Sequence, residues 1–311
     1  MFYFGNYEGQ RRDESPFYSS VLLNNLGAIN TVKQSFGLAP EVLEGKLRKL
    51  NYDSATLRGD YQDTGAHQFN TVYRFRDERG SNLGAATGQL SAPSHFRDSK
   101  IRDHALVTTF TSSLSPRLMN QALFQFANRR FDFRSVTFEP NLEIPNTLDM
   151  GRAFNAPDRT HERRFEFSDT LGYAKGSHNW KVGGSLYRVR DKLSLDAADP
   201  AYFLFPTLDA FFGKFPGVPF PFAVLSISNV GPDGARPPAP RGFGSPANLP
   251  ALEPFTKAES RVWHGGLFAQ DQWKATRRLT VNYGVRWDVD NPPSEGYDRY
   301  YRSIQPRLGL A

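Results

Sequence analysis

The chain has no cysteine among its 311 residues. Without thiols it cannot be a disulfide-stapled scaffold, and it cannot bind a metal through cysteine thiolates. The absence of cysteine therefore excludes many classes of small secreted protein and most classes of zinc-binding domain. It is compatible with a protein of the cell envelope and with many others.

Long hydrophobic runs are also missing. Mean hydropathy is −0.53, and no run approaches the roughly 18 apolar residues of a membrane-spanning helix. Helical membrane proteins are therefore excluded, whereas transmembrane β-barrels are not, because their strands are only half apolar. Residues 1–14 lack the basic region, apolar core and cleavage site of a secretory signal. We therefore expect either a cytoplasmic protein or a piece of a longer chain.

No basic run resembles a nucleic-acid-binding arm. The net charge is +6 and the isoelectric point is near 9.4, but lysine and arginine are interleaved with aspartate and glutamate along the whole chain. Nucleic-acid contacts usually need clustered cations. We therefore expect no nucleic-acid partner.

What the sequence does contain is strict alternation, seen best in RRLTVNYGVRWDVD (277–290). Every second residue from Leu279 to Val289 is apolar, and the residues between are polar, small or charged. Side chains of a strand point alternately to its two faces, so this pattern predicts a strand with one apolar and one wet face.

Similar alternation recurs in about ten segments, most of them joined in pairs by short turns. Each paired segment has about 10–14 residues, longer than the soluble average of about 5–6 and suited to a tilted membrane strand. The predicted strands are 1–8, 53–62, 67–77, 103–114, 118–130, 162–173, 179–190, 261–274, 279–290 and 303–311. Residues 26–49 are predicted to hold a helical turn or two.

Short and long connections alternate along the chain. The long ones are 78–102, 131–161, 191–260 and 291–302, a pattern typical of outer-membrane barrels with short periplasmic turns and long extracellular loops. In hydrocarbon every backbone N–H and C=O needs an internal partner, which a barrel provides. We therefore predict an all-β fold, an antiparallel transmembrane β-barrel, in the cell outer membrane and in contact with its lipid.

Several stretches resemble the barrel of TonB-dependent outer-membrane receptors of the Oar-like group. The most specific is GLFAQDQWKATRRLTVNYGVRWD (266–288), a strand ending in QDQWK, a short turn and LTVNYGVRW. The other segments that carry the resemblance are FYFGNYEGQR (2–11), LNYDSATLRGDYQ (50–62), HQFNTVYRF (67–75), ALFQFANRR (122–130), SHNWKVGGSLYR (177–188) and QPRLGLA (305–311).

The resemblance implies a receptor with a plug domain, about 22 strands and the TonB–ExbB–ExbD complex as its partner. This sequence shows no TonB box and no plug, so we interpret residues 1–311 as a partial barrel domain of about ten strands, with a long extracellular loop at about 191–260. The implied function is import of an unidentified extracellular ligand with TonB-relayed energy. The alternatives are a soluble all-β binding or adhesion domain and a small complete porin-like barrel.

Enzyme motifs are incomplete. His161-Glu162 begins like a zinc-protease helix, but the second histidine four residues after the first is missing. We expect no catalytic residues, no metal and no cofactor.

The candidate functional residues therefore follow from the predicted faces. We predict that Arg58, Asp60, Arg74 and Arg286 face the lumen, either as a charged, solvated lining or as contacts to a substrate. Aromatic rings favour the membrane interface, which assigns Trp180, Trp263, Trp273 and Trp287 to that layer.

Overall fold

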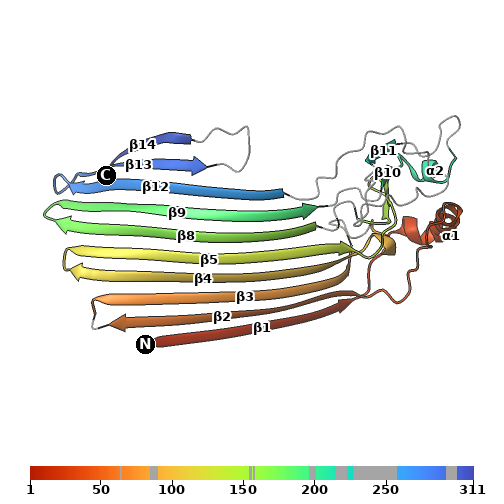
Figure 1. Ribbon diagram of the computed structural model, residues 1–311, viewed down its shortest axis with the longest axis horizontal. Coiled ribbons are helices and arrows are strands. Elements are labelled where there is room, and N and C mark those ends of the chain that lie inside the picture. Colours follow the sequence, from red (N-terminus) through yellow and green to blue (C-terminus); the bar gives the residue numbers. More distant parts are fainter. Residues whose placement is uncertain are drawn as a thin grey trace.

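Long β-hairpins laid side by side form most of the molecule (Figure 1). The computed structural model describes residues 1–63, 65–84, 90–153, 156, 158–195, 201–214, 223–226, 258–291 and 300–311. In these ranges ten antiparallel strands form one sheet, in the order β1-β2-β3-β4-β5-β8-β9-β12-β13-β14. The predicted all-β class and the predicted ten-stranded arrangement are both confirmed.

The strands of this sheet are mostly longer than the sequence pattern predicts. Their bounds are β1 Phe2–Glu14, β2 Arg48–Asp63, β3 His67–Leu83, β4 Arg97–Ser115, β5 Leu118–Ser135, β8 Asp158–Lys175, β9 His178–Leu195, β12 Ala258–Lys274, β13 Thr280–Asn291 and β14 Tyr300–Leu310. The nineteen residues of β4 span about 60 Å, twice the roughly 30 Å hydrocarbon thickness. Some extensions, such as Arg11–Glu14 of β1, are charged on both faces and carry no apolar alternation.

Tight turns join the strands at one end of the sheet. The turn between β2 and β3 uses Gly65 at φ +93°, and the turn between β8 and β9 uses Gly176 at φ +61°. Glycine takes such left-handed conformations without steric cost. The described parts of the long connections lie at the opposite end (Figure 1).

The long connections carry their own secondary structure. Helix α1 (Ser20–Ser35) begins earlier than predicted, because Ser19 caps it by accepting the Leu22 N–H at 3.2 Å, and it ends before Pro40. A second sheet has the order β11-β10-β6-β7. The remaining elements are η1 Pro93–His95, β6 Asn141–Ile144, β7 Leu148–Met150, β10 Tyr202–Leu204, α2 Leu208–Phe211 and β11 Ala223–Ser226. No helix in the described ranges has the length and hydrophobicity to cross a membrane.

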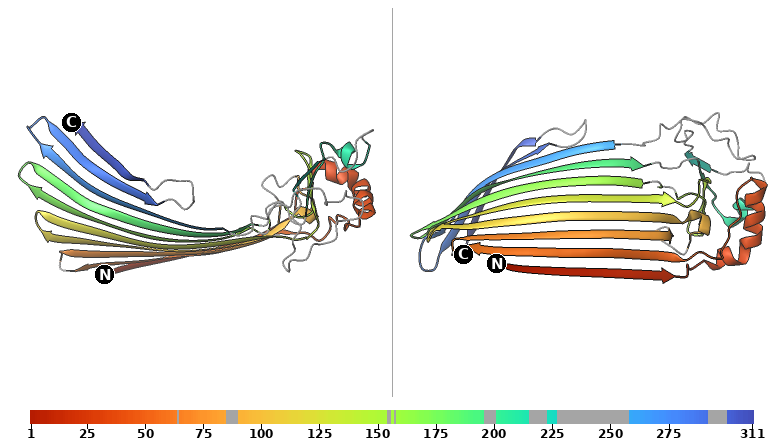
Figure 2. Two further views of the ribbon diagram at one scale, coloured as in Figure 1. Left: turned by 45° about the horizontal axis from the view of Figure 1, so that its top comes forward. Right: turned by 60° about the horizontal axis from the view of Figure 1, so that its bottom comes forward.

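The buried hydrophobic core lies in this loop region and not against the long sheet. We call the assembly of α1, η1, β6, β7, β10 and α2 the loop cap. Its core joins residues from four connections: Leu22, Ile29, Leu38, Ala92, Leu142, Ile144, Leu148, Met150, Ala201, Phe203, Phe205 and Phe211. The cap lies beyond the ends of the long strands, and the long sheet itself is curved (Figure 2).

Candidate functional site: a two-faced sheet and its loop cap

Cross-strand register sorts the side chains of the long sheet onto two faces. On β12 and β13, Leu267 lies opposite Trp287 and Ala269 lies opposite Val285, so their side chains share one face. The same register continues across the sheet. The apolar face so defined carries Tyr3, Tyr7, Leu57, Tyr61, Phe69, Phe110, Phe124, Phe165, Phe167, Val182, Leu186, Trp263, Leu267, Tyr283, Val285, Ile304, Leu308 and Leu310.

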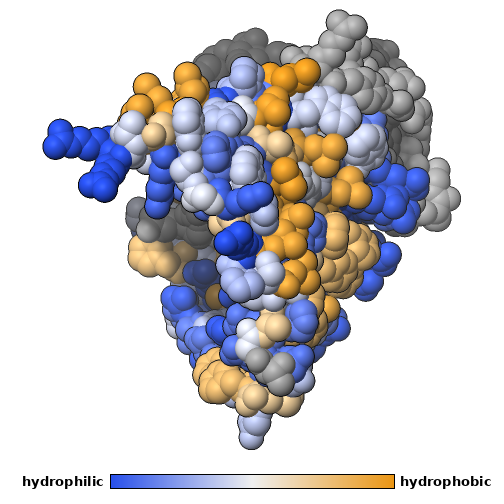
Figure 3. Space-filling view, turned by 90° about the vertical axis from the view of Figure 1, so that its left-hand side faces the viewer, coloured by the Kyte–Doolittle hydropathy of each residue, from blue (hydrophilic) through white to orange (hydrophobic). Residues whose placement is uncertain are grey.

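These apolar side chains are exposed in the isolated chain. Leu267 is 57% exposed and Leu308 is 76% exposed. Viewed along the strands from the turn end, hydrophobic residues gather on one side of the sheet (Figure 3). An apolar face of this extent requires a non-aqueous environment, and in the described residues no second sheet or helix layer covers it.

All four tryptophans of the chain lie on the apolar face. At the turn end, four rings from three strands form a continuous stack. Its successive centroid distances are 5.7 Å for Tyr173–Trp180, 5.0 Å for Trp180–His178 and 5.7 Å for His178–Trp273. Asp271 accepts from the Tyr283 hydroxyl at 2.8 Å and lies 2.6 Å from His178 Nδ1. Rings with a polar tip beside an apolar band suit the headgroup layer.

Trp263 lies on the same strand as Trp273, ten residues away. That spacing is about 33 Å along the strand, or about 25 Å across a bilayer at a strand tilt near 40°. It matches the height of the lipid-facing band of outer-membrane barrels. Trp287 lies directly opposite Leu267 of β12, near the middle of this band, so the register does not give it an interface height. The positions of Trp180, Trp263 and Trp273 support their interface assignment, and the assignment of all four tryptophans remains a prediction.

The polar face holds the four predicted lumen residues. Arg58 and Asp60 form an ion pair at 2.8 Å near the turn end of β2, and Asn70 donates to Asp60 from β3. Arg74 lies on the same face of β3 and Arg286 on that of β13. The register thus places all four on the polar face, and that this face lines a lumen remains a prediction.

The structure does not bring these four residues into one site. Arg74 lines a hollow of about 510 Å³ with Glu8, Tyr52, Arg76 and Asp103. Arg286 lines a separate hollow of about 570 Å³ near the opposite edge of the sheet, with Gln270, Asn282 and Arg307. Six strands separate β2 from β13. Only a closed wall would turn these hollows toward a shared interior.

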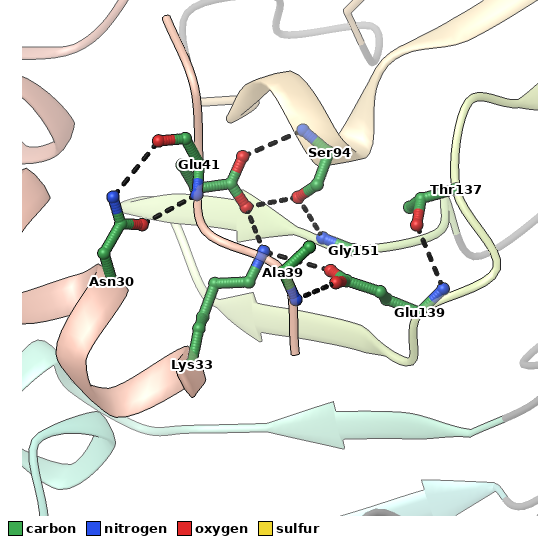
Figure 4. A network of polar contacts seen from close by, with 8 residues as sticks. All are labelled: Asn30, Lys33, Ala39, Glu41, Ser94, Thr137, Glu139 and Gly151. Carbon is green, nitrogen blue, oxygen red and sulfur yellow. Dashed lines mark hydrogen bonds and ion pairs between the residues drawn. The ribbon is translucent and has the colours of Figure 1, made fainter. Parts of the chain in front are cut away.

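A buried ionic cluster holds the loop cap together (Figure 4). Lys33 of α1 and Glu41 have fully buried side chains and are 2.5 Å apart, and Lys33 Nζ is also 3.0 Å from Glu139 Oε2. The Ser94 N–H donates to Glu41 at 2.9 Å. The Ala39 N–H donates to Glu139 at 2.5 Å.

This cluster joins three of the segments that connect the long strands. Lys33 and Glu41 follow β1, Ser94 follows β3 and Glu139 follows β5. Ser94 in turn accepts the Gly151 N–H at 2.7 Å, which ties β7 to the same point. Lys33 shares the buried side of α1 with Leu22 and Ile29. Sequence analysis missed it, although a lone cation at helical spacing in an apolar stripe is the available signal.

Two titratable groups of the cap have opposite pH dependence. Burial lowers the pKa of His95 from 6.5 to about 4, so its contribution to stability is complete above pH 6.5 and is lost as pH falls toward 4. Burial, reinforced by Glu143, raises the pKa of Asp149 from 3.8 to about 6, so its contribution is complete below pH 3.8 and is lost as pH rises through 6.

We therefore expect the stability of the cap to change little between pH 4 and 6, because the two effects oppose each other. Asp149→Asn removes one of them, so the cap should lose up to about 3 kcal/mol on acidification from pH 6.5 to 4. Hydrogen exchange of cap peptides, corrected for intrinsic rates, measures this. His95→Gln should show the reverse slope, and identical profiles for both variants would contradict the assignment.

These observations define a class: a curved antiparallel wall with one face for lipid, one face for water and a folded cap over the long-loop end. The chain belongs to the family described as "Outer membrane beta barrel domain", which matches residues 19–309. The protein is therefore a membrane protein of the cell outer membrane. Because short turns face the periplasm in such barrels, the cap lies on the extracellular side.

The solved structures that resemble this chain include outer-membrane transporters and receptors. The outer membrane transporter YddB from Escherichia coli superposes with a TM-score of 0.52 at 9% identity, over 99% of this chain and 34% of its own. The alcaligin outer membrane receptor FauA from Bordetella pertussis gives 0.49 at 9% identity, over 85% and 33%. This chain thus spans about a third of their length. None of the curated proteins compared matches the chain.

Proposed function

We propose that this chain is part of the wall of a TonB-dependent outer-membrane transporter, of the Oar-like group that its sequence resembles. The intact protein would bind a scarce extracellular ligand and import it with energy relayed by TonB, ExbB and ExbD, with a plug domain inside the barrel. The observation that supports this most is the ten-stranded amphipathic sheet with two open edges and an extracellular cap.

The open edges favour a larger barrel over a small porin. β1 and β14 lie at opposite margins of the sheet, and within the described residues neither pairs with the other. Unpaired backbone at a sheet edge is excluded from hydrocarbon. We therefore propose that further strands complete the wall, whether from more of the same polypeptide or from another chain.

The polar hollows are the proposed ligand contacts in the assembled bore. Arg74 presents guanidinium donors to the interior side, suited to carboxylates or phosphates of an anionic ligand. Arg286 is ion-paired with Asp288 at 2.8 Å. Among the described residues Arg74 has no carboxylate within ion-pair distance, so it is available to a ligand. Arg58 and Asp60 form a closed ion pair, which suits lining better than ligand binding.

The transport proposal is tested in the native organism. Disruption of the coding sequence should abolish uptake of one member of a panel of siderophores, cobalamin and glycans. Deletion of tonB should abolish the same uptake, and Arg74→Ala should weaken it by roughly tenfold, because a charge-assisted hydrogen bond contributes about 1.5–3 kcal/mol. Uptake that survives loss of TonB would refute energy coupling, and unchanged uptake across the panel would refute the transporter assignment.

The soluble-domain alternative is tested by spin labels on β12. The chain has no native cysteine, so single cysteines can be placed at each position from Trp263 to Trp273 in the full chain in lipid vesicles. Collision with oxygen should peak at odd-numbered positions such as Leu267 and Ala269, and collision with a water-soluble nickel complex should peak at even-numbered ones such as Gln270. A soluble domain would instead show low accessibility to both reagents on its apolar side.

A further inference from the structure

The outward face changes character at the edge of the apolar band. On β8 and β9, Phe165 lies directly opposite Arg188, and the next pairs toward the cap are Arg163 with Arg190 and His161 with Lys192. These side chains lie on the same face of the sheet as Phe165, because each is an even number of residues along its strand from an apolar-face residue. Basic residues therefore start within one register step of the lipid-facing aromatics.

We call this region the basic belt. It runs across β4, β5, β8, β9 and β12 on the apolar-face register, on the cap side of the band. Its cations are Lys100, Arg102, Arg130, Arg159, Arg163, Arg188, Arg190, Lys192 and Arg261.

The belt places like charges opposite one another. Arg102 lies opposite Arg130, and Arg163 opposite Arg190, which in turn lies opposite Arg261. Directly opposed like charges destabilise a sheet. An anion bound between the opposed cations would offset this repulsion.

The carboxylates within the belt are too few for its cations. Glu259 is shared by Arg190 at 2.8 Å, Arg261 at 2.7 Å and Lys192 at 3.5 Å. Asp132 lies 3.4 Å from Arg159 and is also paired with Arg134. Arg102 is paired with Asp77 of β3 at 2.7 Å. In the part of the chain that the structure describes, Arg130 and Arg163 have no carboxylate within 4.0 Å, and the Nε of each lies 3.2 Å from His161 Nε2.

The belt also contains a hollow. It has a volume of about 710 Å³, and its charged lining on this face consists of the cations Lys100, Arg102, Arg130, Arg159 and Lys192 and the carboxylates Asp132 and Glu259. That volume falls in the range of sites for molecules of several rings and exceeds what a single phosphate fills. Arginine forks match phosphate oxygens in pairs.

We propose that the basic belt is a binding site for a phosphate-bearing lipid headgroup of the outer leaflet. The occupant follows from position: the belt faces outward and begins where the lipid-facing band ends, at headgroup height, on the cap side. Basic side chains at that height bind anionic headgroups, each contributing measurably. The site depends on the lipid-facing wall and is independent of what the barrel transports.

The test compares two pairs of adjacent arginines that point to opposite faces. Arg130→Gln with Arg163→Gln removes two belt cations, and Arg129→Gln with Arg164→Gln removes two polar-face cations next to them in sequence. The full chain in detergent is titrated with mixed micelles of diphosphoryl lipid A. The belt pair should bind roughly 30-fold more weakly than wild type and the polar-face pair within about threefold, since each cation near the headgroups contributes about 1 kcal/mol.

Further measurements identify the ligand and control for misfolding of the variants. Lipid A stripped of phosphate should lose binding like the belt pair, and Arg130→Lys with Arg163→Lys should retain most of it. Equal losses in both glutamine pairs, no loss in the belt pair, or equally tight binding of inorganic phosphate would overturn the proposal. If the belt pair does not fold, judged by circular dichroism, wild-type binding that persists at about 0.5 M salt would overturn it instead.

Discussion

Replacing Lys33 with methionine should destabilise the loop cap by about 3–5 kcal/mol, because it leaves two carboxylates buried without their shared cation. Glu41 has a fully buried side chain and Glu139 is largely buried, so neither carboxylate can regain full hydration. Hydrogen exchange of peptides covering α1, η1 and β6–β7 should accelerate roughly 150-fold to 5,000-fold, while the long strands stay protected.

Two variants make this result specific to the cluster. Lys49→Met removes an exposed lysine that lies 3.8 Å from Asp13, and it should change stability by no more than about 0.5 kcal/mol. Adding Glu41→Gln and Glu139→Gln to Lys33→Met should restore much of the protection, because no buried charge then remains. A Lys33→Met cap that exchanges like the wild type would show that the cluster does not stabilise the cap.

Replacing Leu267 with arginine should cost about 2–4 kcal/mol of folding free energy in lipid, the range for a cation near the bilayer midplane on a lipid-facing strand. Leu267 lies between Trp263 and Trp273 on β12 and is 57% exposed on the apolar face. Urea titration of the full chain in vesicles measures the loss. Tryptophan emission reports insertion directly, because all four tryptophans lie on that face.

The matched control is Gln270→Arg, three residues along the same strand and on the polar face. Its guanidinium would reach the aqueous side, so we expect a change of no more than about 0.5 kcal/mol. Equal losses for the two arginine variants would contradict the assignment of faces. A loss at Gln270 alone would reverse it.

The ten strands and their faces could be read from the sequence because β alternation is a local property. Val281, Tyr283 and Val285 alternate with polar residues, and the pairing with β12 and β14 then places them on one face. The lengths of the strands could not be read in the same way. In stretches beyond the apolar band such as Arg11–Glu14 and Asp77–Gly80 both faces carry charge, so the period-two hydrophobic signal vanishes in them although the backbone pairing continues.

Sequence alone thus determined a two-faced sheet, its short turns and the side on which Arg58, Asp60, Arg74 and Arg286 lie. Tertiary structure decided which of them are neighbours, because proximity across a sheet depends on the order of strands and on cross-strand register. It also decided the two features that no local pattern contains. The Lys33 cluster joins side chains about a hundred residues apart, and the basic belt arises only when arginines of five strands are aligned at one height.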